Sequence, residues 1–140
     1  MLTRKTTAVA FIAILITAWL MLFFTQVEAQ TLDQQKEALI GEWTGRSEGY
    51  MRASATLIIH EIDTARSKAR CTYASAIWGE KKYPVLADFT PGANPKLDFK
   101  LEMGDYQFVL KNNQLQGSFK GISDGIYVNS TITMEKYSKK

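Results

Sequence analysis

The sequence has few of the residues on which metal sites and catalytic sites depend. One histidine, His60, and one cysteine, Cys71, occur among the 140 residues. A zinc site takes three or four His, Cys or carboxylate ligands, and a Ser–His–Asp arrangement needs an acid that orients its histidine. Glu61 follows His60 directly, but neighbouring residues of a strand point to opposite faces. We therefore expect His60 on the surface, and we predict no metal, no cofactor and no catalytic residue.

The excess of basic over acidic residues is also small, and phosphate-binding motifs are missing. Neither G-x-x-x-x-G-K-[ST] nor G-x-G-x-x-G occurs in the chain. The formal net charge is only +3, which gives nucleic-acid binding little electrostatic basis. The sequence thus favours a non-enzymatic protein with no nucleic-acid partner.

The first 29 residues have the pattern of a secretory signal peptide. Arg4 and Lys5 precede an apolar run from Ala8 to Phe24, and Val27 and Ala29 stand as in an A-x-A cleavage site. We expect cleavage after Ala29 and an exported protein, periplasmic or extracellular. The alternative is an uncleaved anchor, since this run reaches the lower limit of about 17–25 residues for a spanning helix. Membrane contact is then expected only through this N-terminal segment.

The mature chain, residues 30–140, is expected to fold as a single domain. Removing 29 residues from 140 leaves 111, and removing their two basic and one acidic residue takes the net charge from +3 to +2. A lone cysteine in an oxidising compartment is either buried or paired between chains. Ala69, Cys71 and Tyr73 alternate with polar residues, which favours burial of Cys71. The apolar core alone must then hold the domain together.

The segment from Leu97 to Phe119 predicts three short antiparallel strands. Two-residue turns are expected at Gly104-Asp105 and at Asn112-Asn113, and such turns fix the register. The second turn sets Phe108 opposite Gly117, which would leave room for the ring. One face of this sheet would be apolar, with Phe99, Leu101, Met103, Tyr106, Phe108, Leu110, Leu115, Gly117 and Phe119. A slip of one residue would turn all of them to water.

The same reasoning places the next strand and one surface ion pair. The first turn would set Asp98 opposite Lys111 on the polar face. A loop from Ile122 to Gly125 would set Phe119 opposite Val128, so that the apolar face continues along the last strand. Its members there would be Ile126, Val128, Ile132 and Met134.

Before this segment the sequence predicts a short helix from Leu32 to Ile40, with Asp33 as its N-cap. Further short strands are then predicted, the first opening at Gly41 and the others spanning 52–62, 69–77 and 83–89. Pro84 is expected at a sheet edge or a strand start. Together these elements predict an all-β fold, an antiparallel meander barrel of about eight strands with one short N-terminal helix. A split sandwich is the alternative.

A helix followed by Gly41-x-Trp43 at the start of a β-meander resembles the calycin superfamily of lipocalin-like barrels. The resemblance implies that Trp43 closes the floor of the barrel beneath a basic residue of the last strand, here Lys136. It also implies an interior or a mouth that binds a small apolar ligand. The typical lipocalin disulfide is missing, and 111 residues are few for a capacious barrel.

A second resemblance, to small β-domains found alone or in front of secreted α/β-hydrolases, covers more of the mature chain. It rests on Leu39-x-Gly41-x-Trp43-x-Gly45, Tyr83-Pro84-Val85, Leu97-x-Phe99, Leu115-x-Gly117-x-Phe119 and Thr133-Met134-x-Lys136. We expect no hydrolase domain behind this one. We also expect no nucleophile elbow, so this resemblance implies no hydrolase activity.

Aromatic residues are the remaining signal for a binding site. The candidate ligand-binding residues are Trp43, Tyr73, Trp78, Tyr83, Tyr106 and Phe108. The alternative is a filled core, because small barrels are packed solid by their side chains. Trp78 and Tyr83 flank a turn, and as an aromatic patch at the barrel mouth they would stack on a sugar or contact a partner protein.

Two binding functions are left open by the sequence. The first is an exported protein that holds a small apolar ligand in a lipocalin-like barrel. The second is a protein-interaction module, an inhibitor or accessory factor of a cell-envelope or secreted enzyme. A cavity above about 300 Å³ would favour the ligand, and a solid interior would favour the protein partner. An enzyme acting inside the barrel, with His60 and Tyr73 as candidates, has no motif in its favour.

Overall fold

A computed structural model describes residues 14, 16, 31–50 and 52–140. By its contacts the chain divides into Met1–Gln35 and Lys36–Lys140. The predicted signal peptide, residues 1–29, lies outside the described residues except for positions 14 and 16. Within the described part of the chain, no helix is both long enough and apolar enough to cross a membrane.

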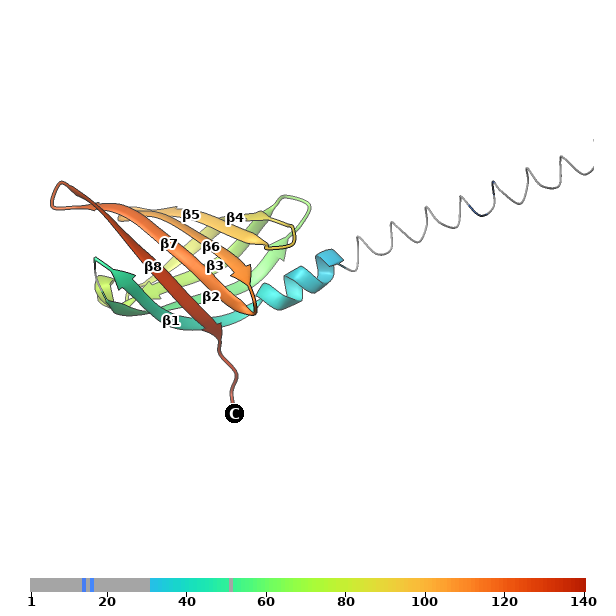
Figure 1. Cartoon of the computed structure of the whole chain (residues 1–140), viewed down its shortest axis with the longest axis horizontal. Coiled ribbons are helices and arrows are strands. Elements are labelled where there is room, and N and C mark those ends of the chain that lie inside the picture. The colour runs from blue at the N-terminus through green and yellow to red at the C-terminus, as the bar shows by residue number, and fades with distance from the viewer. Residues whose placement is uncertain (1–13, 15, 17–30, 51) are drawn as a thin grey trace, which may run out of the picture. The chain divides into compact units, whose positions relative to one another are not determined.

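Residues 31–39 are helical, and eight strands follow. Asp33 therefore lies inside the helix, and its prediction as the N-cap is wrong. The strands are β1 (Gly41–Gly49), β2 (Ala53–Asp63), β3 (Lys68–Ser75), β4 (Lys82–Thr90), β5 (Lys96–Leu101), β6 (Gly104–Lys111), β7 (Gln114–Ser123) and β8 (Ile126–Lys136) (Figure 1). A short 3-10 helix, η1 (Ala76–Trp78), connects β3 to β4.

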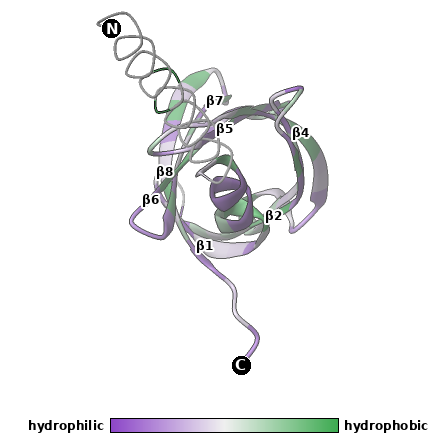
Figure 2. Ribbon diagram, turned by 90° about the vertical axis from the view of Figure 1, so that its right-hand side faces the viewer, coloured by the Kyte–Doolittle hydropathy of each residue, from purple (hydrophilic) through white to green (hydrophobic). Residues whose placement is uncertain are grey.

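The strands form a closed barrel in which each pairs with its neighbour in sequence and β8 pairs with β1. Viewed along its axis the sheet forms a closed ring (Figure 2). The predicted eight-stranded antiparallel meander barrel is confirmed, and the alternative of a split sandwich is wrong. Closure gives the first and last strands a partner on both sides, which removes the exposed edges of an open sheet.

Inward-facing residues alternate along the strands and fill most of the interior. In β3, Ala69, Cys71, Tyr73 and Ser75 are all buried, so the predicted burial of the lone thiol is confirmed. In β2, Leu57 and Ile59 face inward, and a β-bulge between Ile59 and Glu61 shifts the phase so that Ile62 is buried too. Within the run 57–59 the strand alternates normally, with Ile58 on the outer face, so the bulge accounts for the burial of Ile62.

The central strands keep their predicted faces, but only one of two predicted turns is right. Phe108 lies opposite Gly117 across the turn at Asn112-Asn113, as predicted. The turn between β5 and β6 is at 102–103 instead of Gly104-Asp105, so that Phe99 lies opposite Tyr106. Because the register moves by an even number of residues, the apolar face is preserved.

These shifts correct two further predictions. Asp98 faces Gln107, whose Nε2 donates to Asp98 Oδ1 at 2.9 Å, so the predicted pairing with Lys111 is wrong. The loop after β7 is the two-residue turn at 124–125, and Phe119 lies opposite Ser130 instead of Val128. Val128, Ile132 and Met134 are buried as predicted, whereas Ile126, at the tip of this hairpin, is 64% exposed.

The barrel is closed least completely between β4 and β5. Only three positions pair there, from Asp88 opposite Asp98 to Thr90 opposite Lys96. Pro84 lies in the part of β4 that has no β5 partner, where its missing N–H breaks no ladder hydrogen bond on that side. It is also the third residue of its strand, in agreement with the predicted position at an edge or a strand start.

Candidate functional site at the barrel mouth

The two ends of the barrel differ, and we call them the floor and the mouth. The floor is the end where β1 begins and β8 finishes. There Trp43 is 2% exposed, and its Nε1 donates to the carbonyl oxygen of Leu39 at 2.8 Å. Leu39, in the last helical turn, is fully buried. The floor is therefore sealed by apolar packing.

Lys136 of β8 lies opposite Trp43 in the β1–β8 ladder. Its Nζ is 5.7 Å from the centre of the indole ring, within the range of a cation–π interaction. The same ammonium donates to the carbonyl oxygens of Glu37 at 3.1 Å and Ala38 at 3.0 Å, which satisfies acceptors at the end of the helix. The arrangement of Trp43 and Lys136 implied by the calycin resemblance is confirmed.

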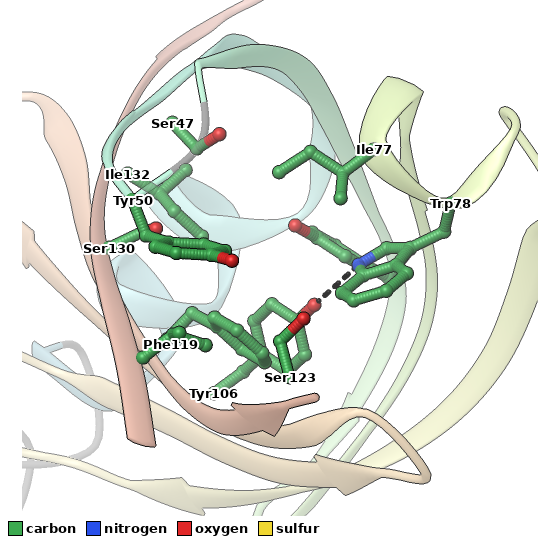
Figure 3. A pocket seen from close by; sticks show the side chains of 11 residues that line it. Ser47, Tyr50, Ile77, Trp78, Tyr106, Phe119, Ser123, Ser130 and Ile132 are labelled. Atoms are coloured by element: carbon green, nitrogen blue, oxygen red, sulfur yellow. Dashed lines mark hydrogen bonds between the residues drawn. The ribbon is translucent and has the colours of Figure 1, made fainter. Parts of the chain in front are cut away.

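The mouth is the opposite end, where the connections after β1, β3, β5 and β7 lie. A pocket of about 80 Å³ opens there (Figure 3). Its lining is formed by Ser47, Tyr50, Tyr73, Ile77, Trp78, Tyr106, Phe119, Ser123, Val128, Ser130 and Ile132. Aromatic and aliphatic side chains make up the walls, the polar groups are hydroxyls and the indole N–H of Trp78, and none of the described lining residues is charged.

A hydrogen-bonded aromatic pair forms one wall of this pocket. Trp78 Nε1 donates to the hydroxyl of Tyr106 at 3.1 Å, which fixes the indole against the barrel (Figure 3). Tyr106 also packs on Tyr73 and Phe119, with ring centres 4.7 and 4.8 Å away. Burial raises the pKa of Tyr106 above its ordinary value, and the hydrogen bond from Trp78 opposes that shift. The hydroxyl is therefore neutral in any near-physiological buffer.

Two inward-facing serines are also buried in the lining. Ser47 is 3% exposed and its Oγ donates to the carbonyl oxygen of Ala53 at 3.3 Å. Ser130 of β8 is 8% exposed. Both occupy positions where the alternation of the strand calls for an apolar side chain.

Three of the six predicted ligand-binding residues line the pocket: Tyr73, Trp78 and Tyr106. The other three do not. Trp43 is at the floor, and Phe108 is fully buried, with its ring stacked on Phe99 at 5.9 Å. Tyr83 is half-buried beneath Lys81, whose Nζ is 5.2 Å from its ring centre.

The sequence-based reasoning missed the serines of the pocket. Ser47 lies four residues after Trp43 and Ser130 two residues before Ile132, so strand alternation puts each on the apolar face. Strand alternation was the signal that could have identified these serines. A serine at an inward-facing position fills less of the interior than an apolar residue would.

The sequence also contains the spacing of a nucleophile elbow, although none was predicted. Residues Gly121 to Gly125 read G-x-S-x-G. An elbow requires a sharp turn from a strand into a helix, whereas Ser123 ends β7 just before a turn into another strand, β8. Ser123 has no histidine partner, because His60 is exposed on β2 and contacts Thr72 instead, with Nε2 2.8 Å from its Oγ1. The motif is therefore a hairpin and not an elbow.

No cluster of three potential metal ligands occurs among the described residues. Cys71 is buried in the barrel wall, and burial raises its pKa to about 12, so the thiol is neutral and unsuited to metal binding.

Outside the barrel, a groove runs along the mouth beside the β7–β8 hairpin. It has a volume of about 480 Å³ and is bordered by Leu101, Met103, Ile122 and Tyr127 among others. Ile122 is 61% exposed and Tyr127 87% exposed. This groove is open to solvent and adjoins the mouth pocket at Val128, which lines both.

No family model matches the sequence, and no curated protein matches it. Among solved structures, the barrel is similar to the ileal bile acid-binding protein of zebrafish, determined in complex with cholic acid. The TM-score is 0.45 with 12% sequence identity, over 71% of this chain and 99% of that one. The topology and the floor are those expected of a small calycin-like barrel. The fold is an eight-stranded antiparallel meander barrel. At its mouth, the described residues line a pocket of about 80 Å³.

Proposed function

We propose that this protein is an exported, non-enzymatic binding protein that holds a small apolar group in the mouth pocket of its calycin-like barrel. The observation that carries the proposal is the pocket itself: an apolar lining, entered from one end, with hydroxyl groups placed on its walls. Small-molecule sites have this character, mostly apolar with a few placed polar groups.

The volume restricts what can bind. At about 80 Å³ the pocket is below the volume of about 300 Å³ expected of an enclosed ligand, so the criterion of cavity volume by itself favours the protein partner. The interior is otherwise filled by aromatic and aliphatic side chains, so a large ligand cannot be enclosed. The proposed ligand is therefore a molecule of a few heavy atoms, or one end of a longer molecule whose remainder lies against Tyr50 and Trp78 at the mouth.

The proposal of a non-enzymatic role is supported by the chemistry of the lining. The hydroxyls of serine and tyrosine and the rings of tyrosine and tryptophan face the pocket. No general base or charged group lies beside them in the lining. The histidine is on the outer surface and the thiol is buried in the barrel wall.

Binding is tested by native mass spectrometry and solvent extraction of freshly purified protein, and by titration with an apolar fluorophore. The variant Ser130→Leu places a branched side chain inside the pocket, and Thr131→Leu is its control on the outer face of the same strand. We expect the fluorophore to bind the wild type and Thr131→Leu but not Ser130→Leu. Absence of any bound molecule and of fluorophore binding in the wild type would refute the proposal.

Export is proposed from the N-terminal pattern of residues 1–29 alone. It is tested by expressing the full chain and determining the N-terminus of the protein that accumulates outside the cytosol. We expect Gln30 as the first residue. A product that retains Met1 and stays in the membrane fraction would indicate an uncleaved anchor.

A second candidate function, a protein-interaction module, is supported by the outer groove. Ile122 and Tyr127 expose apolar surface beside it, and exposed apolar patches are typical of contact surfaces. An inhibitor or accessory factor of a secreted or cell-envelope enzyme would use such a surface. The test is affinity capture from envelope extracts with wild type and with the double variant Ile122→Ser, Tyr127→Ser. A partner held equally well by both would not bind at this groove.

A further inference from the structure

We infer that the mouth pocket receives the alkyl end of its ligand and leaves any polar or charged group of that ligand outside, so that the site selects the tail and not the charge of the head group. The inference rests on the proposed binding function and specifies the class and the orientation of its ligand. Four observations carry it: hydrogen bonds completed within the protein, a lining without charge, a small volume and an apolar rim.

The buried hydrogen-bonding groups of the lining already have partners in the protein. Trp78 Nε1 donates to the hydroxyl of Tyr106 at 3.1 Å, and the same hydroxyl is hydrogen-bonded to Tyr73. Ser47 donates to the carbonyl oxygen of Ala53. Among the described residues, no fully buried side-chain nitrogen or oxygen lacks a hydrogen-bond partner. A ligand is therefore not needed to complete a hydrogen bond here, whereas a polar group that entered would lose its own bonds to water.

Charge is absent from the lining and mixed beyond it. None of the described lining residues is Lys, Arg, His, Asp or Glu. An ionised group that entered the pocket would lose its hydration without gaining a counter-charge, which strongly disfavours a buried ion. Outside the lining, Glu80 and Lys81 follow Trp78 in the chain, and Asp124 follows Ser123. Because both signs occur there, the mouth favours neither an anionic nor a cationic head group.

The volume favours an alkyl end over an aromatic ring. The pocket measures about 80 Å³, whereas a protein cavity that binds benzene has a volume of about 150 Å³. The walls are themselves packed, since the ring of Tyr106 lies 4.7 Å from that of Tyr73 and 4.8 Å from that of Phe119, centre to centre. A narrow, unbranched chain end of a few carbons therefore fits where a six-membered ring does not.

The rim continues the apolar lining outward. Figure 3 shows Tyr50 and Trp78 on opposite sides of the pocket, and Tyr50 is 55% exposed. Ile126, which lies opposite Ser123 in the β7–β8 ladder, is 64% exposed. Methylene groups that extend beyond the pocket can therefore contact apolar side chains and remove further surface from water.

The experiment compares hexan-1-ol, hexanoate and hexylammonium, which share one tail and differ in the charge of the head, with 3-phenylpropan-1-ol, an alcohol of similar hydrophobicity that ends in a ring. Each is titrated at pH 7 into the protein purified after expression of the full chain, and binding is followed by NMR chemical shifts. We expect the three hexyl probes to bind within about threefold of one another and the ring-ended alcohol at least tenfold more weakly.

A tenfold preference for one head group, or equal affinity for the ring-ended alcohol and hexan-1-ol, would overturn this inference and leave the proposed binding function intact. If no hexyl probe binds although the apolar fluorophore does, the inference fails alone. If the fluorophore does not bind either, the proposed function fails with it.

The orientation is read directly from nuclear Overhauser effects between hexan-1-ol and the wild-type protein. We expect the terminal methyl group to contact the rings of Tyr106 and Phe119, which are 3% and 8% exposed. Contacts from the CH₂–OH protons to these two rings, in place of the methyl group, would overturn the orientation.

A matched pair of variants locates the head group. Ser123→Lys places a cation at the rim, where Ser123 ends β7, and Thr131→Lys places one on the outer face of β8. We expect Ser123→Lys to strengthen hexanoate binding and weaken hexylammonium binding, each about twofold to fivefold, the range for an exposed ion pair. Thr131→Lys should change neither, and near-UV circular dichroism checks that both variants are folded. Equal hexanoate affinity for folded Ser123→Lys and the wild type would overturn the position given to the head group.

Discussion

The contact between Gly117 and Phe108 gives a sharp test of how tightly this barrel is packed. A methyl group added at Gly117 would lie 2.4 Å from Cε1 and 2.6 Å from Cδ1 of Phe108. Carbon atoms in contact are ordinarily about 3.5–4.0 Å apart, so the ring would have to move by more than about 1 Å. The ring is fully buried and packs on Tyr73 and Phe99, with centres 6.4 and 5.9 Å away. It therefore has no free space into which to move.

Overpacking of this kind costs about 1–3 kcal/mol. Replacing glycine by alanine also lowers the entropy of the unfolded chain, which offsets about 0.4–1 kcal/mol. We therefore expect Gly117→Ala to lower the free energy of unfolding by about 1–2 kcal/mol. For a domain of this size, each kcal/mol corresponds to about 4–8 °C in Tm. Urea denaturation followed by circular dichroism measures the first quantity and calorimetry the second.

A double-mutant cycle separates the steric effect from any backbone effect. In the background Phe108→Leu, which removes most of the ring, Gly117→Ala should cost less than about 0.5 kcal/mol, so that the coupling between the two sites is about 1 kcal/mol or more. Ser118→Ala, the next residue on the outer face, is the surface control. Equal costs in both backgrounds would refute the steric explanation, and full stability of Gly117→Ala would show that the interior is looser than described.

Three other predictions concern the floor and the buried titratable groups. Lys136→Met should destabilise the fold by about 1–2 kcal/mol in urea, because it removes two hydrogen bonds to helix carbonyls and the contact with Trp43, while Lys139→Met in the C-terminal tail should have no effect. Cys71 should resist iodoacetamide at pH 8 in the native protein and react fully in guanidinium chloride, since its pKa is raised to about 12 and it is buried; rapid native labelling would contradict its burial. Burial raises the folded-state pKa values of Cys71 and Tyr73, so these side chains ionise more readily in the unfolded chain. The free energy of unfolding should therefore be constant below about pH 9 and fall as the pH rises toward 12, with a slope approaching about 1.4 kcal/mol per pH unit for each group. Urea midpoints that stay constant up to pH 12 would contradict this.

The faces of the strands could be predicted from the sequence more safely than the turns. Face depends only on whether a position is odd or even along the strand, so a register error of an even number of residues leaves every side chain on its correct side. The turn at Asn112-Asn113 was predicted correctly because asparagine tolerates the positive φ that a tight hairpin requires. Both asparagines adopt positive φ in the structure.

Gly104 misled the prediction of the preceding turn for a physical reason. Glycine was interpreted as a turn residue, but Gly104 is the first residue of β6, with a φ of +152°. A Cβ there would meet the carbonyl oxygen of Lys120 and the ring of Phe119 at 2.3 and 2.6 Å. The glycine is thus required by close approach of β7, a long-range contact that no local pattern contains. The Asp124-Gly125 pair, in contrast, carried a local hairpin signal that the longer predicted loop passed over.

The site was harder to predict than the fold because aromatic residues mark both a packed core and a pocket. Trp43, Phe108 and Tyr106 are alike in the sequence, and only their positions along the barrel axis distinguish floor, core and mouth. Those positions depend on the stagger of all eight strands around the barrel. The register errors at two turns therefore left the predicted faces correct. They nevertheless changed which residues of neighbouring strands lie at the same height along the barrel axis.

The pocket exists at the mouth because the two strands that close the barrel carry their largest inward side chains at the floor and serines near the mouth. On β1 the inward series runs from Trp43 at the floor through Gly45 to Ser47. On β8 it runs from Met134 through Ile132 to Ser130. Since β1 and β8 pair in antiparallel register, with Ser47 opposite Ile132, the small residues of both strands fall near the same end and their deficits in volume add. A protein selected for stability alone would fill such a space, because buried apolar contact is favourable. The proposed ligand would complete the packing at this end, so filling the space with a larger side chain should stabilise the fold and abolish the proposed binding together.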